Sequence, residues 1–307
     1  MDTAAKSKLG ARQWVAFALL CAIWGSTWMA ISVVVRDVPP FHACALRFLL
    51  ATVLMGGALA VRRRPLPRDR ASWKVMLVLG VTMIATPYAL IFWAEQYVAS
   101  SMTAVIYSLA PLLVALLTPL MSHRKVPRRA VFAMVLGVGG IAVIFETGLR
   151  ASTRALVGGF TILLAVLVTS WAIHYAKKRA HDLDPLLSTG VQHAVGTVAL
   201  FGLSVAFERH ATYHWTAPSI AALFFLGVIG SALAFAVYYW LLKQMEPYKI
   251  SSLNLVTPLI AIAEGALLLG EPVPLIMIIA SLVVLGAVAS VLRAPREKAF
   301  SLRDAAG

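Results

Sequence analysis

Charged residues are scarce in this chain. They make up 13% of its 307 residues, whereas 60% are hydrophobic and the mean hydropathy is +0.84. Soluble domains carry about 25% charged and about 45–50% apolar residues. A chain with so few charges cannot cover a water-soluble fold of this length, so we predict a membrane protein that crosses the bilayer several times.

Cysteine is rare as well, and familiar catalytic motifs are missing. Cys21 and Cys44 both lie in apolar segments without a CxxC motif, so we expect packing residues and not a disulfide framework. No Walker loop, GxSxG or HExxH occurs, so neither ATP-driven pumping nor hydrolase chemistry has support. His210 and His214 have helical metal spacing but no other clear ligand. We therefore expect no catalytic residue, no metal and no cofactor.

Long apolar runs, in contrast, recur throughout the chain. About 20 helical residues cross the hydrocarbon core, which is about 30 Å thick. We therefore predict an all-α polytopic membrane protein with ten transmembrane helices and short polar linkers. The predicted spans are residues 14–35, 41–61, 73–93, 98–121, 129–145, 157–176, 185–207, 217–241, 248–269 and 273–292, between tails at 1–13 and 293–307.

The basic residues indicate the orientation of these helices. With the N-terminus in the cytoplasm, 22 of the 27 Lys and Arg fall in inner loops and tails, four in outer loops, and Arg47 inside a span. Cytoplasmic loops collect Lys and Arg, so this bias predicts that both termini are cytoplasmic in a bacterial-type inner (plasma) membrane. The net charge of +14 is then a signal of topology and not of a nucleic-acid partner.

An internal repeat relates the two halves of the chain. A shift of 147 residues without gaps superposes Trp, Gly and Pro landmarks, namely Trp24 on Trp171, Gly80 on Gly227, Trp93 on Trp240, Pro111 on Pro258 and Gly139 on Gly286. Each repeat, 14–146 and 147–292, contains five predicted spans, so the two must enter the membrane in opposite senses. Inverted repeats are typical of transporters that bind substrate near the midplane, between the repeats.

Four segments also resemble a known family. They are AIWGSTWMAI (22–31), ALRFLLA (45–51), SLAPLLVALL (108–117) and LVTPLIAIAEGALLLGEPV (255–273). Together they resemble the drug/metabolite transporter superfamily, in particular its ten-helix EamA-type members, and most of all bacterial exporters of aromatic and other neutral amino acids. The resemblance implies that helices 1–4 and 6–9 surround a central cavity, with helices 5 and 10 outside. The first repeat departs from the pattern, because HRKV (123–126) stands where the second has GEPV (270–273).

Several polar and aromatic residues in the predicted spans are candidates for lining the cavity. Pro111 and Pro258 free the carbonyls of Tyr107 and Asn254, which an ammonium group can use, although a proline kink that only shapes packing is the alternative. The remaining candidates are one aromatic triplet on each of helices 1 and 6, and polar or aromatic residues on helices 3, 8 and 9. They are Trp24, Thr27, Trp28, Trp171, His174, Tyr175, Tyr88, Ser231, Tyr238, Tyr239 and Ser251.

Two charged residues stand clearly inside the predicted spans. Arg47 and Glu264 lie roughly 9 Å and roughly 7 Å below the outer surface at the rise of an α-helix. Their similar depth allows an ion pair that acts as a clamp or an outer gate, and Glu264 is also a candidate proton carrier, with His193 a lesser one.

These observations favour an exporter of small amphipathic metabolites, above all aromatic and other neutral amino acids. Alternating access around a central cavity is the expected mechanism, and few membrane carboxylates favour facilitated export. The alternatives are a proton-coupled efflux transporter for drugs or quaternary amines, a membrane enzyme acting on lipid, and an assembly factor that does not transport. The expected partners are an amino-acid substrate, the lipid bilayer and a second copy in a homodimer.

Overall fold

The computed structural model of the protein describes residues 10–62, 66–122, 128–148, 152–180, 182–242, 244 and 253–292. In these residues it contains helices and no β-strand. The helices of the first half are α1 (Ala11–Asp37), α2 (Pro40–Val61), α3 (Arg70–Leu79), η1 (Gly80–Ala85), α4 (Thr86–Ala94), α5 (Ser100–Tyr107), α6 (Ala110–Ser122) and α7 (Arg128–Gly148). Those of the second half are α8 (Thr153–Arg179), α9 (Pro185–Phe207), α10 (Ala217–Phe224), η2 (Phe225–Leu233), α11 (Ala234–Leu242), α13 (Leu253–Leu268) and α14 (Leu275–Leu292).

Seven helices of the described part are long and apolar enough to cross a membrane. They are Ala11–Asp37, Pro40–Val61, Arg70–Ala94, Ser100–Met121, Thr153–Arg179, Pro185–Phe207 and Ala217–Tyr238. Three shorter apolar stretches, Val131–Gly140, Leu253–Leu268 and Leu275–Ala289, lie where the sequence predicts further spans. The protein is therefore an all-helical, multi-pass membrane protein, and the count of ten spans stays a prediction.

Polar side chains fix where several helices begin. The Asp69 carboxylate accepts from the Ser72 N–H at 2.7 Å, and Asp184 accepts from the Leu187 N–H at 3.0 Å. These contacts pair backbone donors that have no partner within the helix. The linkers therefore do more than connect the spans, because their aspartates also fix where α3 and α9 begin.

Proline and glycine interrupt three of the long helices. The predicted span 98–121 is split, because α5 ends at Tyr107 and α6 begins at Ala110. Pro111 explains the break, since its ring clashes with the carbonyl four residues earlier and it donates no hydrogen bond. A π-helical segment, η1, precedes Pro87, and a second, η2, contains Gly227 and Gly230. These interruptions are points at which the long helices can bend.

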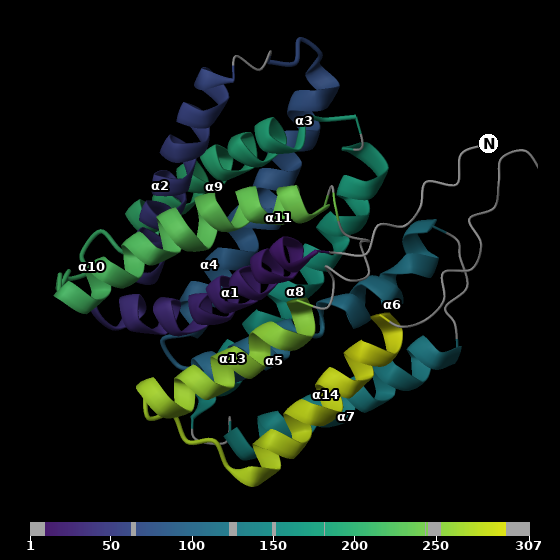
Figure 1. The fold of residues 1–307 in the computed structure, drawn as a ribbon. Helices are drawn as coiled ribbons and strands as arrows, with labels where there is room; N and C mark the ends of the chain where they lie inside the picture. Colours follow the sequence, from purple (N-terminus) through teal and green to yellow (C-terminus); the bar gives the residue numbers. More distant parts are fainter. Residues whose placement is uncertain are drawn as a thin grey trace, which may run out of the picture.

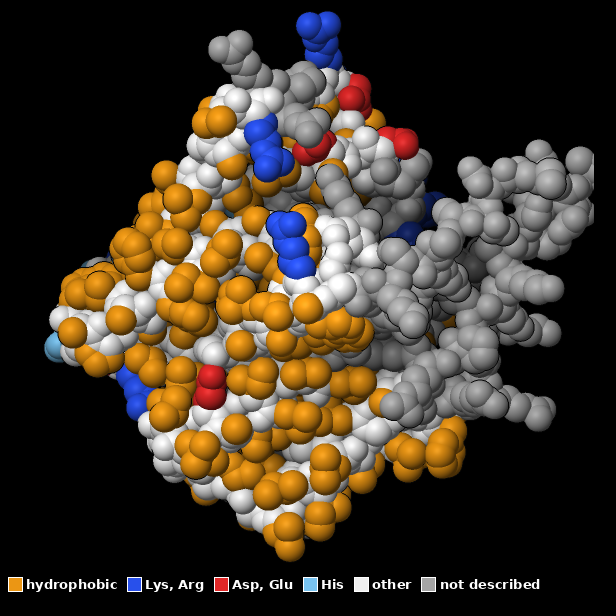
Figure 2. All heavy atoms as spheres, viewed as in Figure 1, with side chains coloured by type: hydrophobic (Ala, Val, Ile, Leu, Met, Phe, Trp, Pro, Cys, Tyr) orange, Lys and Arg blue, Asp and Glu red, His pale blue; other side chains and the backbone are white. Residues whose placement is uncertain are grey.

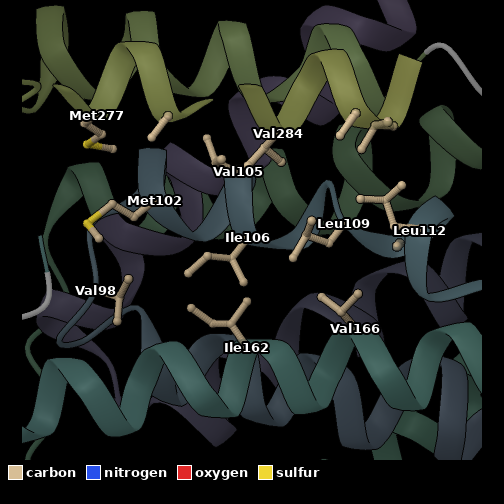
Figure 3. Packing of buried hydrophobic residues seen from close by; sticks show 14 of the residues in the cluster. Val98, Met102, Val105, Ile106, Leu109, Leu112, Ile162, Val166, Met277 and Val284 are labelled. Atoms are coloured by element: carbon tan, nitrogen blue, oxygen red, sulfur yellow. The ribbon is translucent and has the colours of Figure 1, made fainter. Parts of the chain in front are cut away.

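The helices of the two halves pack closely on one another (Figure 1). α2 runs along α9, α14 along α7, α4 against α8, and α1 against α13, α10 and α11. Figure 3 shows α5 between α8 and α14, where Val105 and Ile106 of α5 meet Ile162 of α8 and Val284 of α14. All four side chains are fully buried. The core therefore joins elements from both halves.

Hydrophobic side chains also cover much of the described surface on the face shown in Figure 2. Leu267, Leu120, Val198 and Phe207 are each at least 74% exposed. Such large exposed apolar areas are unusual on soluble proteins and are expected where lipid surrounds the protein. The surface agrees with a protein embedded in a bilayer.

Candidate functional site

Aromatic side chains of α1 meet aromatic side chains from two other helices. The Trp24 ring lies 5.8 Å from Phe235 and 5.3 Å from Tyr238, both on α11. One turn further along α1, Trp28 lies 5.3 Å from Tyr107, the last residue of α5. The spacing of four residues places both tryptophans on one face of α1. This face therefore contacts both halves of the chain.

Tyr107 connects this aromatic group to α8. Its hydroxyl lies 3.3 Å from Thr169 Oγ1, where either group can donate. Thr27, between the two tryptophans in sequence, is buried and donates from Oγ1 to the Trp24 carbonyl at 2.7 Å. It lies so close to η2 that a Cβ at Gly230 would approach Thr27 Cγ2 to 2.9 Å. The helices here are in close contact.

A cation stands beside this group, deep in the fold. Arg47 of α2 is 3% exposed, and its Nε donates to Ser231 Oγ of η2 at 3.1 Å. Its guanidinium carbon lies 4.8 Å from the Tyr88 ring centroid, 5.1 Å from Phe48 and 6.0 Å from Phe92. Cation–π contacts of this kind are stronger when water is excluded. Arg47 Nη1 is buried and has no hydrogen-bond partner.

His193 of α9 adds a second polar group with a free atom. Its Nδ1 lies 2.8 Å from the Thr189 carbonyl, which can only accept, so Nδ1 carries the hydrogen. Its ring packs against Phe48 at 5.2 Å and Phe235 at 5.3 Å. Nε2 is buried without a partner. We define the central cluster as Trp24, Trp28, Arg47, Phe48, Tyr88, Tyr107, His193, Ser231, Phe235 and Tyr238.

The predicted triplet on α8 lies apart from the central cluster. Trp171 is 37% exposed, and its ring stacks on Tyr175 at 5.2 Å with an interplanar angle of 17°. His174 Nε2 lies 3.2 Å from Thr118 Oγ1 of α6, and its Nδ1 lies 3.1 Å from the Ser170 carbonyl. The structure thus brings together the α1 triplet and not its counterpart on α8.

The ion pair that similar depth allowed between Arg47 and Glu264 is not formed in the structure. Glu264 Oε1 accepts from Ser26 Oγ of α1 at 2.6 Å, and Oε2 is buried without a partner. α2 packs mainly along α9 and η2, whereas α13 packs along α1 and α5. Depth alone therefore misled the prediction, because the two helices contact different neighbours.

The proline and helix-9 candidates have mixed outcomes. Pro111 lies in α6 just after the break, and Pro258 is buried within α13, which continues through it. Asn254 is half-buried on α13. Ser251 lies outside the described residues, as does the side chain of Tyr239.

Three acidic residues outside the predicted spans are also buried or bonded, and none of them is among the predicted site residues. Glu271 of the GEPV loop accepts from the N–H and Oγ of Ser100 at 2.8 and 2.7 Å, and from the same groups of Ser101 at 3.1 and 2.5 Å. Glu208 accepts from the N–H groups of Phe41 and His42 at 2.7 and 2.9 Å. Glu271 and Glu208 thus each cap the N-terminus of a helix from the other half of the chain. A negative charge is favourable at a helix N-terminus. In the sequence, the two adjacent serines at the start of α5, Ser100 and Ser101, were the only sign that a carboxylate could be bound there.

Glu95, the third of these acids, has no such partner. It follows the last residue of the span Arg70–Ala94, is 5% exposed, and neither carboxylate oxygen has a hydrogen bond. Burial raises the pKa of Glu95 well above its usual value, the negative charge of Glu271 adds to this, and Arg47 opposes it. Burial therefore favours the neutral, protonated form of this carboxyl group.

A large pocket among the described residues lies elsewhere. It has a volume of about 1210 Å³ and lies between the α1–α2 turn, α4 and the end of α9. Trp93, Tyr97, Leu203, Phe207 and His214 are among its lining residues, and none of the predicted binding residues is. His210 and His214 both line it, and no group of three or more His, Cys, Asp or Glu in the described chain is arranged to hold a metal.

Comparison with known proteins identifies the family. The sequence profile of the EamA-like transporter family matches residues 12–146 and 156–293. These ranges cover most of the chain, so the chain belongs to the EamA-like transporter family and is a membrane transporter.

Individual relatives agree with this assignment. The "Uncharacterized transporter YoaV" of Bacillus subtilis (strain 168) is 26% identical over 265 residues, which cover 85% of this chain and 90% of the relative. The "Uncharacterized inner membrane transporter YedA" of Escherichia coli (strain K12) is 26% identical over 256 residues, covering 82% and 81%. A solved crystal structure with 17% identity has a TM-score of 0.63 and covers 94% of this chain and 100% of the other. That likeness shows a shared fold.

Proposed function

We propose that this transporter exports small amphipathic metabolites, above all aromatic and other neutral amino acids, across the bacterial inner membrane. The observation that carries the proposal is the central cluster, in which aromatic rings from α1, α4, α5 and α11 surround buried polar groups. Aromatic walls with a few placed polar groups suit a ligand that is apolar at one end and polar at the other.

The mechanism we propose is alternating access between two inverted five-helix repeats, with both termini in the cytoplasm. The interruptions at η1, η2 and the α5–α6 break provide places where the helices around the central cluster can bend. Glu264 links α13 to α1 through Ser26, so this contact is a candidate gate between the halves. The outward gradient of substrate is the minimum driving force for the cycle, and a coupled proton would add to it.

The main alternative, efflux of drugs or quaternary amines, fits the central cluster less well. A site for an organic cation needs a nearby anion or an electron-rich cage without a competing cation. Here the buried Arg47 guanidinium already lies over the Tyr88, Phe48 and Phe92 rings. Glu264, the acid that such a mechanism would use, bonds Ser26 and does not belong to the central cluster.

Counterflow in liposomes that contain only this protein tests the proposal. Vesicles preloaded with unlabelled phenylalanine are expected to accumulate external labelled phenylalanine transiently, whereas empty vesicles do not. If no aromatic or neutral amino acid exchanges, the proposed function is wrong. A reporter fused after Gly307 tests the topology separately, and an external reporter would contradict cytoplasmic termini.

A further inference from the structure

We propose that Arg47 and His193 form a recognition site for a zwitterion, in which Arg47 binds the carboxylate of the substrate and His193 Nε2 accepts from its ammonium group. The inference rests on the proposed function and names the substrate class of the central cluster. It starts from two buried atoms without partners, Arg47 Nη1 and His193 Nε2. Buried polar atoms are nearly always hydrogen-bonded, so unpaired ones in a transporter interior point to an absent ligand.

No acidic side chain of the described chain serves as the counterion of Arg47. Glu264 bonds Ser26, Glu271 is bonded by Ser100 and Ser101, and Glu208 is bonded at the start of α2. Asp37, the last residue of α1, accepts a hydrogen bond from the Thr216 hydroxyl. Glu95 interacts electrostatically with Arg47 but makes no hydrogen bond to it. The guanidinium therefore keeps a charge that nothing in the described chain neutralises by contact.

The surroundings of Arg47 hold the guanidinium in one orientation. Ser231 fixes Nε, and the rings of Tyr88 and Phe48 lie against the guanidinium carbon. Nη1 is then left as a donor that is already positioned. Planar guanidinium groups bind carboxylates strongly and with defined geometry, which a lysine ammonium does not reproduce.

His193 provides the complementary acceptor on the same aromatic ring. The Phe48 ring lies 5.1 Å from the Arg47 guanidinium carbon and 5.2 Å from the His193 ring. Since Nδ1 donates to the Thr189 carbonyl, Nε2 presents a lone pair. A donor for a carboxylate and an acceptor for an ammonium thus belong to side chains that both lie close to one phenyl ring. An α-amino acid carries both groups on one carbon, with an apolar side chain left for the aromatic walls.

Competition by analogues that each lack one charged group tests the proposal. Phenylalaninamide lacks the carboxylate, and 3-phenylpropionate lacks the ammonium. Against phenylalanine counterflow, the wild-type protein is expected to prefer phenylalanine over the amide by on the order of 30-fold or more, as expected for loss of a buried charged contact. Arg47→Gln should abolish this preference and spare the one against 3-phenylpropionate. His193→Phe should do the reverse.

Matched controls separate recognition from folding. Arg154 also lies over an aromatic ring, Tyr97 at 5.7 Å, but outside the central cluster, so Arg154→Gln should leave both preferences unchanged. If Arg47→Gln does not fold, Arg47→Lys and Ser231→Ala keep the positive charge and are expected to reduce the preference over the amide.

The outcomes also distinguish this inference from the proposed function. Exchange that persists with an unchanged preference in Arg47→Gln, or in both substitute variants, overturns the zwitterion site and leaves the exporter intact. Wild-type protein that exchanges no amino acid overturns the proposed function itself. A preference that disappears equally in Glu95→Gln would also overturn the inference, because Arg47 would then act through an ion pair with Glu95.

Discussion

The aromatic faces of α1 and α8 are related by the internal repeat, yet they lie in different surroundings. On α1, Trp24 and Trp28 pack against rings of α11 and α5. On α8, Trp171 is 37% exposed and stacks on Tyr175 of its own helix. Equivalent sequence positions therefore do not guarantee equivalent packing. The two halves therefore differ in the side-chain packing of this helix face.

The glycines of η1 and η2, in contrast, make matching contacts. A Cβ at Gly80 would lie 2.6 Å from Val195 Cβ of α9, and a Cβ at Gly227 would lie 2.7 Å from Leu50 Cβ of α2. Each π-helical segment thus packs through a glycine against the second long helix of the other half. The two halves therefore share their close glycine contacts, whereas the aromatic side chains of α1 and α8 lie in different environments.

The largest effect should come from removing an aromatic ring on α1. Trp28→Ala is expected to destabilise the protein by about 3 kcal/mol, because it deletes a large, partly buried side chain that packs against the hydrophobic core. Loss of its ring contact with Tyr107 should also weaken the apparent affinity for aromatic amino acids by about tenfold. Thermal unfolding in detergent and concentration-dependent counterflow measure the two effects.

The equivalent change on α8 provides the control. Trp171→Ala should cost about 1 kcal/mol or less, since the ring is partly exposed and stacks only on Tyr175 among the ring contacts found. Equal losses of stability in the two variants would show that the halves are packed alike. The asymmetry between α1 and α8 would then be wrong as a description of the protein.

A smaller effect, similar in both halves, is expected from the two contact glycines. Gly80→Ala and Gly227→Ala should each destabilise by about 1–3 kcal/mol, because the added methyl group overlaps a packed side chain. It also approaches a backbone oxygen, that of Gln192 at 3.2 Å from position 80 and that of Arg47 at 3.1 Å from position 227. The unfolding temperatures of the two variants measure this directly.

Gly139 and Gly286 form the matched control pair. They too are related by the repeat, but a Cβ at either position meets nothing within 4 Å. Alanine there should be neutral or stabilise by about 0.5–1 kcal/mol through its higher helix propensity. A large difference between Gly80→Ala and Gly227→Ala would contradict the symmetry of the two contacts.

Much of this architecture could be predicted from the sequence, because hydropathy and proline act locally. The long apolar helices, an irregularity of the helix at Pro111 and an Arg47 within a span all follow from composition along the chain, whereas the full break between Tyr107 and Ala110 did not. The Arg47–Glu264 pair did not follow, because helix rise gives depth and not the direction in which a side chain points. That direction depends on neighbours such as Ser231 and Ser26, which only tertiary packing brings near.

Acidic residues next to span ends were harder still to interpret. Hydropathy places Glu95 and Glu271 in loops, where charged residues are ordinary. In the fold both are drawn into contact regions between helices, one bonded four times and the other not at all. No local pattern distinguishes these two outcomes, because each depends on whether helix N–H groups from a distant segment are within reach.

Glu95 supplies an effect that depends on pH and a further difference between the halves, since the repeat places Leu242 at its equivalent position. Burial raises the pKa of folded Glu95 well above its unfolded value, so the folded state keeps a proton that the unfolded state loses. The stabilising contribution is therefore complete below the unfolded pKa and is lost as pH rises toward the folded pKa. One proton corresponds to a slope of about −1.4 kcal/mol per pH unit in the unfolding free energy.

Glu95→Gln should remove this slope, because the amide stays neutral at every pH. Unfolding temperatures measured from pH 5 to about pH 9 should then fall less steeply than in the wild-type protein. Asp69→Asn is the control of opposite sign: its hydrogen bond from Ser72 lowers the pKa of the Asp69 carboxyl, so it changes no proton in this range and should shift the curve without tilting it. If Glu95→Gln leaves the slope unchanged, the buried carboxyl group is ionised and paired in the folded protein. Glu95 would then not make the stability of the first half depend on pH in a way that Leu242 does not in the second.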